Sequence, residues 1–376
     1  MTEGRCDQRY EPVREAFIAN FDAGLEVGAS VAVVHRGELV VDLWGGSCDA
    51  AGSTPWTADT ITNVWSSTKT MTALCVLILV DRAEVDVDAP VARYWPEFAA
   101  NGKDGVLVRH LMSHTAGLSG WQEPMVEADL YDWEKATALL AAQAPWWEPG
   151  SASGYHAITQ GYLLGDVVRR VTGRTVGRFF AEEVAGPFGA DFHIGVPAEA
   201  DRRIANVIPP PVQPGADAEP GSIAARSLTN PTPDATWSWT TPWRRAEIPA
   251  ANGHGNARSI ARIQAVVSHG GEAFGVRLLS PSTIEVIVRE QCDGVDLVMG
   301  EPLRHGIGYG LANEVRPVPP GACFWGGWGG SLVLNDVDAQ LTVTYVMNRM
   351  GEGAPADQRA PQVALAAYSA VAALTP

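Results

Sequence analysis

The chain has 376 residues, 46% of them hydrophobic and 19% charged, which is long enough and apolar enough for a large globular core. Its formal net charge of −16 disfavours nucleic acid and anionic membranes as partners, because both are bound through clustered Lys and Arg. We therefore expect a small molecule as the partner, with no nucleic acid and no membrane, and the oligomeric state stays open.

The cysteines and the first residues of the chain indicate the cellular compartment in which the protein is expected. The five cysteines are widely spaced and show neither a disulfide framework nor a Cys-x-x-Cys metal pair. The first residues, Met-Thr-Glu-Gly-Arg-Cys, are not followed by the apolar stretch of a secretory signal. The longest apolar run, Met71–Val80, is too short to span a bilayer. These features predict a soluble, cytoplasmic protein.

The first part of the chain combines a helix with two strands. Residues 11–23 have the pattern of an amphipathic helix. Ser30–Val34 and Glu38–Leu43 are rich in β-forming residues and are joined by three residues, which predicts a hairpin. Residues 68–83 are apolar on nearly all sides, as expected for a buried central helix.

The middle of the chain is helical, and its end returns to strands. Helical patterns lie around 106–116, 133–143 and 158–172, and the last of them ends at Gly173, a plausible C-cap. Residues 205–245 are rich in Pro and Trp, and the tryptophans favour an ordered, packed loop over disorder. The remaining predicted elements are a helix at 257–269, strands at 331–334 and 340–347, and a helix at 361–374.

Strands at both chain ends with helices between them predict a layered fold of mixed α/β and α class. We expect an antiparallel sheet built from both ends and flanked by helices, with an inserted helical lobe. Residues 1–80 and 246–376 would form the α/β lobe, and residues 81–245 the mainly helical lobe with its Pro/Trp-rich loop. An active site is then expected between the lobes.

The run Ser66-Ser67-Thr68-Lys69 heads the buried helix and contains a Ser-x-x-Lys spacing. If Ser66 opens the helix, Lys69 lies one turn later on the same face, and the two side chains can form a hydrogen bond. A lysine in a half-buried cleft loses solvation, so its pKa falls and its neutral amine can serve as base for a serine nucleophile. Lys69 is also one of only three lysines. The alternative is a chance spacing, with Ser66 as an N-cap and Lys69 in solvent.

A Ser-x-x-Lys motif at the head of an apolar helix resembles the first motif of penicillin-binding proteins and serine β-lactamases. Three further segments resemble the class C β-lactamase-like branch and, within it, the family VIII carboxylesterases. They are Asp86–Phe98 (DVDAPVARYWPEF), Leu111–Leu118 (LMSHTAGL) and residues 147–156 (WEPGSASGYH). The similarity extends from about residue 25 to residue 350. It implies the β-lactamase/penicillin-binding-protein-like fold and a serine hydrolase.

The second motif of that family, Tyr-x-Asn, corresponds here to Tyr155-His156-Ala157. The resemblance implies that Tyr155 reaches the Ser66–Lys69 pair and shuttles the proton. A tyrosine beside an ammonium is easier to ionise, so the pair could share one proton. Without its neighbouring motifs, Tyr155 would be interpreted as a core tyrosine. In β-lactamases the missing asparagine holds the amide of the substrate, so Ala157 removes an anchor for peptide-like substrates.

The third motif, Lys-Thr-Gly in β-lactamases, corresponds to Trp325-Gly326-Gly327. The family's lysine and threonine bind a substrate carboxylate, whereas Trp325 offers no cation and suits a neutral, apolar ester group. The glycines allow a close approach of the strand, and the resemblance implies that the backbone N–H of Trp328 joins that of Ser66 in an oxyanion hole. The alternative, a glycine-rich turn before a strand, does not explain the adjacent tryptophans.

Other aromatic residues and histidines are weaker candidates. Tryptophans of the Pro/Trp-rich loop are expected to wall an apolar pocket: Trp237, Trp239 and Trp243. His156 and His254 are expected to contact the substrate, although a loop histidine with satisfied hydrogen bonds is the competing interpretation of His254. His110 and His114 have the spacing of two metal ligands on a helix, but no His-Glu-x-x-His pattern and no third ligand accompany them. We expect no metal and no cofactor.

Together these residues predict a serine carboxylesterase for neutral, fairly apolar esters. Ser66 would form an acyl-enzyme, with Lys69 and Tyr155 as general base and acid. The rival predictions are an acyltransferase on the same scaffold and a β-lactamase or D-amino-acid peptidase. A non-catalytic binding protein is the remote alternative. The absence of a Gly-x-Ser-x-Gly elbow from the sequence argues against an α/β-hydrolase.

Overall fold

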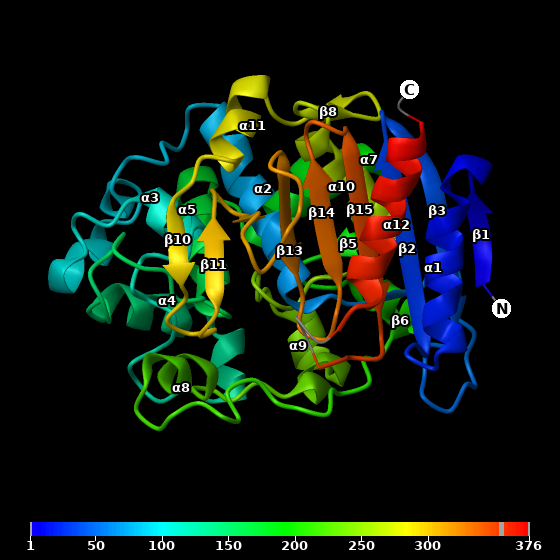
Figure 1. Ribbon diagram of the computed structural model, residues 1–376. Helices are drawn as coiled ribbons and strands as arrows, with labels where there is room; N and C mark the ends of the chain where they lie inside the picture. Colours follow the sequence, from blue (N-terminus) through cyan, green and yellow to red (C-terminus); the bar gives the residue numbers. More distant parts are fainter. Residues whose placement is uncertain (1, 353–356, 375–376) are drawn as a thin grey trace.

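The computed structural model describes residues 2–352 and 357–374, and its centre is a nine-stranded antiparallel sheet (Figure 1). The strand order is β1-β3-β2-β15-β14-β13-β12-β11-β10, so the two chain ends meet where β2 pairs with β15. This confirms the predicted sheet built from both ends of the chain. Its strands are β1 (Thr2–Cys6), β2 (Gly28–His35), β3 (Glu38–Gly46), β10 (Cys292–Val295), β11 (Pro302–His305), β12 (Gly310–Leu311), β13 (Ala322–Gly326), β14 (Leu332–Asp336) and β15 (Leu341–Met347).

Helices cover both faces of this sheet (Figure 1). On one face α1 (Glu11–Asp22) packs against α12 (Arg359–Ala373), and on the other α10 (Ala257–Ser268) packs against β2, β14 and β15. The next layer contains α2 (Thr68–Asp81), in which every residue from Thr68 to Leu79 is buried. Each buried Leu, Ile or Val of such a helix stabilises the fold by roughly 1.5–3 kcal/mol. The predicted buried central helix is therefore confirmed.

The middle of the chain forms the helical part, as predicted, and α2 packs against it through α5 and α6. The α-helices here and beyond are α3 (Val108–Met112), α4 (Trp133–Ala142), α5 (Thr159–Thr172), α6 (Val176–Phe180), α7 (Gly186–Phe188), α8 (Ile223–Leu228), α9 (Thr241–Arg245) and α11 (Pro281–Ile287). The short helical turns are η1 (Gln8–Tyr10), η2 (Trp65–Ser67), η3 (Val91–Arg93), η4 (Pro96–Gly102), η5 (Glu127–Tyr131), η6 (Ala181–Ala185), η7 (Ala198–Arg203) and η8 (Ala235–Trp239). No helix in the described ranges is both long and apolar enough to cross a membrane.

Two small sheets join distant segments. One has the order β5-β7-β4-β6, and the other is the hairpin β8-β9. Their strands are β4 (Ile61–Asn63), β5 (Phe192–His193), β6 (Ile204–Ala205), β7 (His254–Gly255), β8 (Glu272–Ala273) and β9 (Val276–Arg277). Because β4 leads directly into η2 and α2, the first of these sheets holds the segment that carries Ser66.

Most of the predicted elements are present, with shifted ends. The helix expected at 106–116 is reduced to α3, because His114, two residues after its end, has a positive φ angle that does not fit a helix. The strands β10 to β12 have only two to four residues and were not predicted. Residues 205–245 form α8, η8 and α9, in agreement with an ordered loop. The division into lobes at residues 81 and 245 stays a prediction.

Candidate active site

Ser66 lies in η2, the turn that precedes α2, and its side chain is partly exposed. The α-helix itself begins at Thr68, so the expectation that Ser66 opens the helix is corrected by one short turn. Before it stands Trp65, buried and with a φ of +49°, an outlying backbone conformation for a bulky residue. The ring of Trp65 is held between Trp243 at 5.4 Å and Trp328 at 4.8 Å. Packing thus imposes the strained turn that presents Ser66.

Lys69 lies on the first turn of α2 and is almost fully buried. Its Nζ is 3.1 Å from Ser66 Oγ, 2.7 Å from the carbonyl oxygen of Ala157 and 3.0 Å from that of Ala250. Burial lowers the pKa of Lys69 well below its usual value. Among the described residues no carboxylate pairs with it. A neutral amine can donate its two N–H groups to the two carbonyls, which leaves its lone pair directed at Ser66 Oγ.

Tyr155 completes the group from a segment without regular secondary structure, residues 153–156. Its Oη donates to Ser66 Oγ at 2.6 Å. Burial raises the pKa of Tyr155 to about 12, so the expectation of an easily ionised tyrosine is wrong. The physical reason is that burial disfavours the phenolate, and the same burial lowers the pKa of Lys69, the neighbouring group whose positive charge would have had the opposite effect. The three side chains therefore form a chain of hydrogen bonds, Tyr155 to Ser66 to Lys69.

The glycine-rich end of β13 lies against the turn that carries Ser66. A Cβ on Gly327 would be 2.2 Å from the carbonyl oxygen of Val64 and 3.3 Å from the backbone nitrogen of Ser66. Only glycine allows this approach. In the described backbone, the N–H groups of Ser66 and Trp328 have no hydrogen-bond acceptor. They are therefore free to bind a substrate oxygen, which is compatible with the expected oxyanion hole, although that role stays a prediction.

Trp325 is surrounded by aromatic rings. It stacks on His114 at 5.2 Å with 22° between the planes, and its ring centroid is 5.6 Å from that of Tyr155. His305 follows at 5.7 Å. The adjacent Gly326 is exposed and would accommodate a Cβ without a close contact. At the position of the family's carboxylate-binding lysine, the structure thus has an aromatic wall beside Tyr155.

The tryptophans of the Pro/Trp-rich loop are not equivalent. Trp243 is fully buried and donates from Nε1 to Asn63 Oδ1 at 2.9 Å, so it supports Trp65 from behind and does not line a pocket. Trp237 is half-buried against Trp243 at 5.8 Å. Trp239 is 43% exposed and is tied by Nε1 to the carbonyl oxygen of Val207. The expectation that Trp243 contacts the substrate is therefore corrected.

The two histidines expected to contact the substrate are both fully buried. The Nε2 of His156 accepts from the backbone N–H of Leu118 at 3.1 Å, and its Nδ1 contacts the carbonyl oxygen of Gly154 at 2.6 Å. His254 lies in β7 with Nδ1 at 2.8 Å from the carbonyl oxygen of Asn252. The structure does not bring either ring to Ser66, because both rings form hydrogen bonds with nearby backbone groups.

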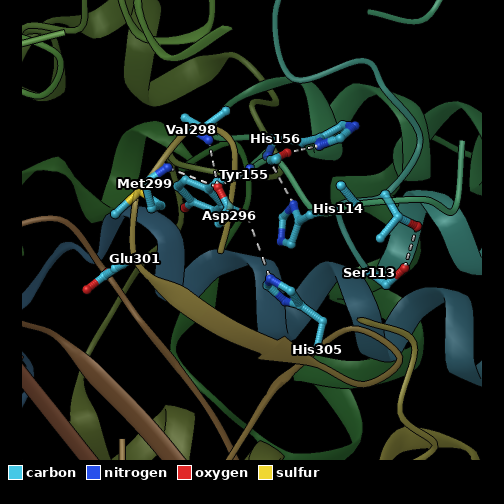
Figure 2. A network of polar contacts seen from close by, with 12 residues as sticks. Ser113, His114, Tyr155, His156, Asp296, Val298, Met299, Glu301 and His305 are labelled. Atoms are coloured by element: carbon cyan, nitrogen blue, oxygen red, sulfur yellow. Dashed lines mark hydrogen bonds and ion pairs between the residues drawn. The ribbon is translucent and has the colours of Figure 1, made fainter. Parts of the chain in front are cut away.

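The sequence did not reveal a polar network behind Tyr155 (Figure 2). Asp296, fully buried, accepts from the backbone N–H of Tyr155 at 2.9 Å. His305 places Nε2 4.0 Å from the second oxygen of Asp296, and His114 packs edge-on against the ring of Tyr155 at 5.1 Å. His110, the other member of the metal-like pair, instead accepts from the backbone N–H of Leu107. Within the described ranges, no group of three His, Cys, Asp or Glu side chains could hold a metal ion.

Comparison with known proteins places this chain in a family. The beta-lactamase family profile matches residues 17–368. The esterase/beta-lactamase LipL of Mycobacterium tuberculosis H37Rv is 37% identical over 92% of this chain and 83% of its own length. Esterase EstB of Burkholderia gladioli is 28% identical over 89% and 90% of the two chains.

Among solved structures, a family VIII carboxylesterase is similar over 98% of this chain and 100% of its own. Its TM-score is 0.93 and its sequence identity 43%. The family profile, the relatives and this structure agree with the resemblance predicted from the spaced motifs. The chain belongs to the beta-lactamase family, and within it resembles the family VIII carboxylesterases.

Proposed function

We propose that the protein is a serine carboxylesterase that hydrolyses neutral, fairly apolar carboxylic esters through an acyl-enzyme on Ser66. The observation that carries the proposal is the position of Ser66 Oγ, 3.1 Å from Lys69 Nζ and 2.6 Å from Tyr155 Oη. A serine becomes nucleophilic when a base within hydrogen-bonding reach can take its proton. The esterase relatives support the reaction class.

Acylation begins when Ser66 Oγ passes its proton to the neutral amine of Lys69 and attacks the ester carbonyl carbon. The carbonyl oxygen gains negative charge and accepts from the free N–H groups of Ser66 and Trp328. When the tetrahedral intermediate collapses, the bond to the alcohol oxygen breaks and Tyr155 gives that oxygen its proton. The ammonium of Lys69, 4.8 Å from the centre of the Tyr155 ring, then restores the proton of the tyrosine.

Deacylation reverses these transfers with water as the nucleophile. The water oxygen attacks the acyl carbon while water gives a proton to Tyr155, and Tyr155 passes its own proton to the amine of Lys69. The bond to Ser66 Oγ breaks, the serine regains its proton, and the carboxylic acid leaves. Lys69 thus acts as the base of both half-reactions, and Tyr155 carries the proton to and from the oxygen that faces it.

The substrate class follows from the surroundings of Ser66. Trp325, stacked on the buried His114 and beside Tyr155, offers no cation where the family has a lysine, so a substrate carboxylate would lose its hydration there without that charged partner. The net charge of −16 also repels anionic substrates. Neutral esters have neither disadvantage.

The test uses p-nitrophenyl esters of increasing acyl length on the wild type and Ser66→Ala. We expect hydrolysis by the wild type and a loss of at least about 1,000-fold in the variant, because the nucleophile is absent. Cys48→Ala serves as the matched control, since it shortens a partly buried side chain that does not belong to the group around Ser66. Full activity of Ser66→Ala would refute the proposal.

A second candidate reaction is the hydrolysis of β-lactams, because a 37% identical relative carries that activity in its name. Ala157 and Trp325 disfavour it, since neither provides the amide or the cation that the family uses to hold these substrates. We expect turnover of a chromogenic cephalosporin to be slow relative to ester hydrolysis. Efficient turnover would reverse this ranking.

A further inference from the structure

The backbone around Tyr155 is held in an unusual way. Residues 153–156 belong to no helix or strand, yet three successive N–H groups have partners from distant parts of the chain. Gly154 donates to the carbonyl oxygen of His114 at 3.0 Å, Tyr155 to Asp296 Oδ1 at 2.9 Å, and His156 to His114 Nδ1 at 3.1 Å. Two residues, His114 and Asp296, thus do for this segment what a neighbouring strand does in a sheet.

Asp296 connects Tyr155 to the turn between β10 and β11. Its Oδ1 also accepts from the backbone N–H groups of Val298 and Met299, each at 2.9 Å (Figure 2). The turn is joined to the same segment a second time, because Leu297 donates to the carbonyl oxygen of Ser153 at 2.9 Å. A carboxylate oxygen with three N–H donors in a site closed to water is a rigid link.

The second carboxylate oxygen of Asp296 makes no interaction that would explain why this residue is buried here. It lies 4.0 Å from Nε2 of His305, and within the described part of the chain neither atom has a hydrogen-bond partner. Burial keeps the pKa of His305 below its usual value, so the ring is neutral and the pair is not an ion pair that stabilises the fold. A fully buried carboxylate is costly, and the hydrogen bonds that it makes to described residues are those to the backbone of Tyr155 and of the turn.

We propose that Asp296 is a positioning residue for the esterase reaction: by fixing the backbone of Tyr155 to the β10–β11 turn, it holds the hydroxyl of Tyr155 where it can protonate the leaving alcohol. This rests on the proposed function. Ser66 and Lys69 are placed by α2 and its preceding turn, so they do not depend on this link. Tyr155 does, because no helix or strand holds it.

The leaving group distinguishes positioning from a general structural role. A p-nitrophenolate leaves without a proton at neutral pH, whereas an alkoxide needs the proton of Tyr155. The ratio of kcat/KM for an ethyl ester to that for the p-nitrophenyl ester of the same acid therefore reports the acid step. A lower fraction of folded enzyme reduces both values equally and leaves the ratio unchanged.

The experiment measures this ratio for the wild type, Asp296→Ala, Asp296→Asn and Tyr155→Phe. We expect a fall of about tenfold or more in Asp296→Ala, since a shift of a fraction of 1 Å in an acid group has effects of this size. Tyr155→Phe should fall further. Asp296→Asn keeps an acceptor oxygen for the three N–H groups and should retain the ratio within about threefold.

The matched control is Asp336→Ala at the far end of β14. Asp336 is also buried, with Oδ1 accepting from the backbone N–H of Ala339 at 2.9 Å and Oδ2 from Tyr368 Oη at 2.8 Å. It should lose stability but keep the wild-type ratio. An unchanged ratio in Asp296→Ala, or a fall in Asp296→Asn as large as in Asp296→Ala, would overturn the inference. A wild type whose ester hydrolysis does not depend on Ser66 would instead refute the proposed function.

Discussion

Gly327→Ala tests how closely the end of β13 must approach Ser66, the proposed nucleophile. The new Cβ would lie 2.2 Å from the carbonyl oxygen of Val64 and 2.3 Å from Ser331 Oγ, about 1 Å short of ordinary van der Waals contact. The carbonyl belongs to the backbone that leads into Ser66, so it cannot swing aside as a side-chain end can. Either the strand end, with the N–H of Trp328, or the Ser66 turn must move by about 1 Å.

A displacement of this size at reacting groups costs about 100-fold in rate, and we expect kcat/KM for p-nitrophenyl esters to fall by about that factor. Overpacking should also destabilise the fold by roughly 1–3 kcal/mol, so the assay is run well below the measured Tm. Gly326→Ala is the control, because its Cβ would meet nothing closer than 3.4 Å. It should stay within about threefold of wild type. Equal activity of the two variants, with equal Tm, would refute the reasoning.

Two further predictions concern Lys69. Lys69→Arg should be nearly as damaging to kcat/KM as Lys69→Ala, because a guanidinium keeps the charge but does not give up a proton; an active Lys69→Arg enzyme would make Lys69 a purely electrostatic partner. Activity should also be lost as the pH falls through the lowered pKa of Lys69, since protonation removes the base. No alkaline decline from Tyr155 should appear below about pH 10, because its pKa is about 12. A pH profile of kcat/KM checks both limbs, and a tyrosine-dependent decline near pH 9 would contradict this assignment.

The residues that could be predicted from the sequence are those tied together by local spacing. Ser66 and Lys69 are three positions apart, and the turn that joins η2 to α2 brings them together whatever the rest of the fold does. Trp325 and the two glycines after it form a continuous motif on β13. Residues so close in sequence can be predicted to lie together, and the predicted contact between Ser66 and Lys69 is present.

Other features depend on tertiary structure alone. Asp296 is 141 residues from Tyr155 and stands in a loop with no motif around it, so nothing in the sequence marks it as a partner. The tryptophan cluster shows a related limit. Composition indicated that Trp243 is packed, but not that Trp65 lies between it and the site. The prediction that His156 contacts the substrate rested on its neighbour Tyr155, but its ring is bound to the backbone of Leu118 and Gly154.

The opposite pKa shifts of Lys69 and Tyr155 have one cause. Removal from water disfavours the charged form of each group, so burial lowers the pKa of the amine and raises that of the phenol. The shifts thus favour the uncharged form of both groups beside Ser66, an amine with a lone pair and a phenol with a proton. If Lys69 and Tyr155 shared a single proton, the two side chains could not both accept the proton of Ser66 and donate a proton to the leaving alcohol. In the proposed reaction, burial with no carboxylate partner among the described residues would thus supply a base and an acid from side chains that in water would both be protonated.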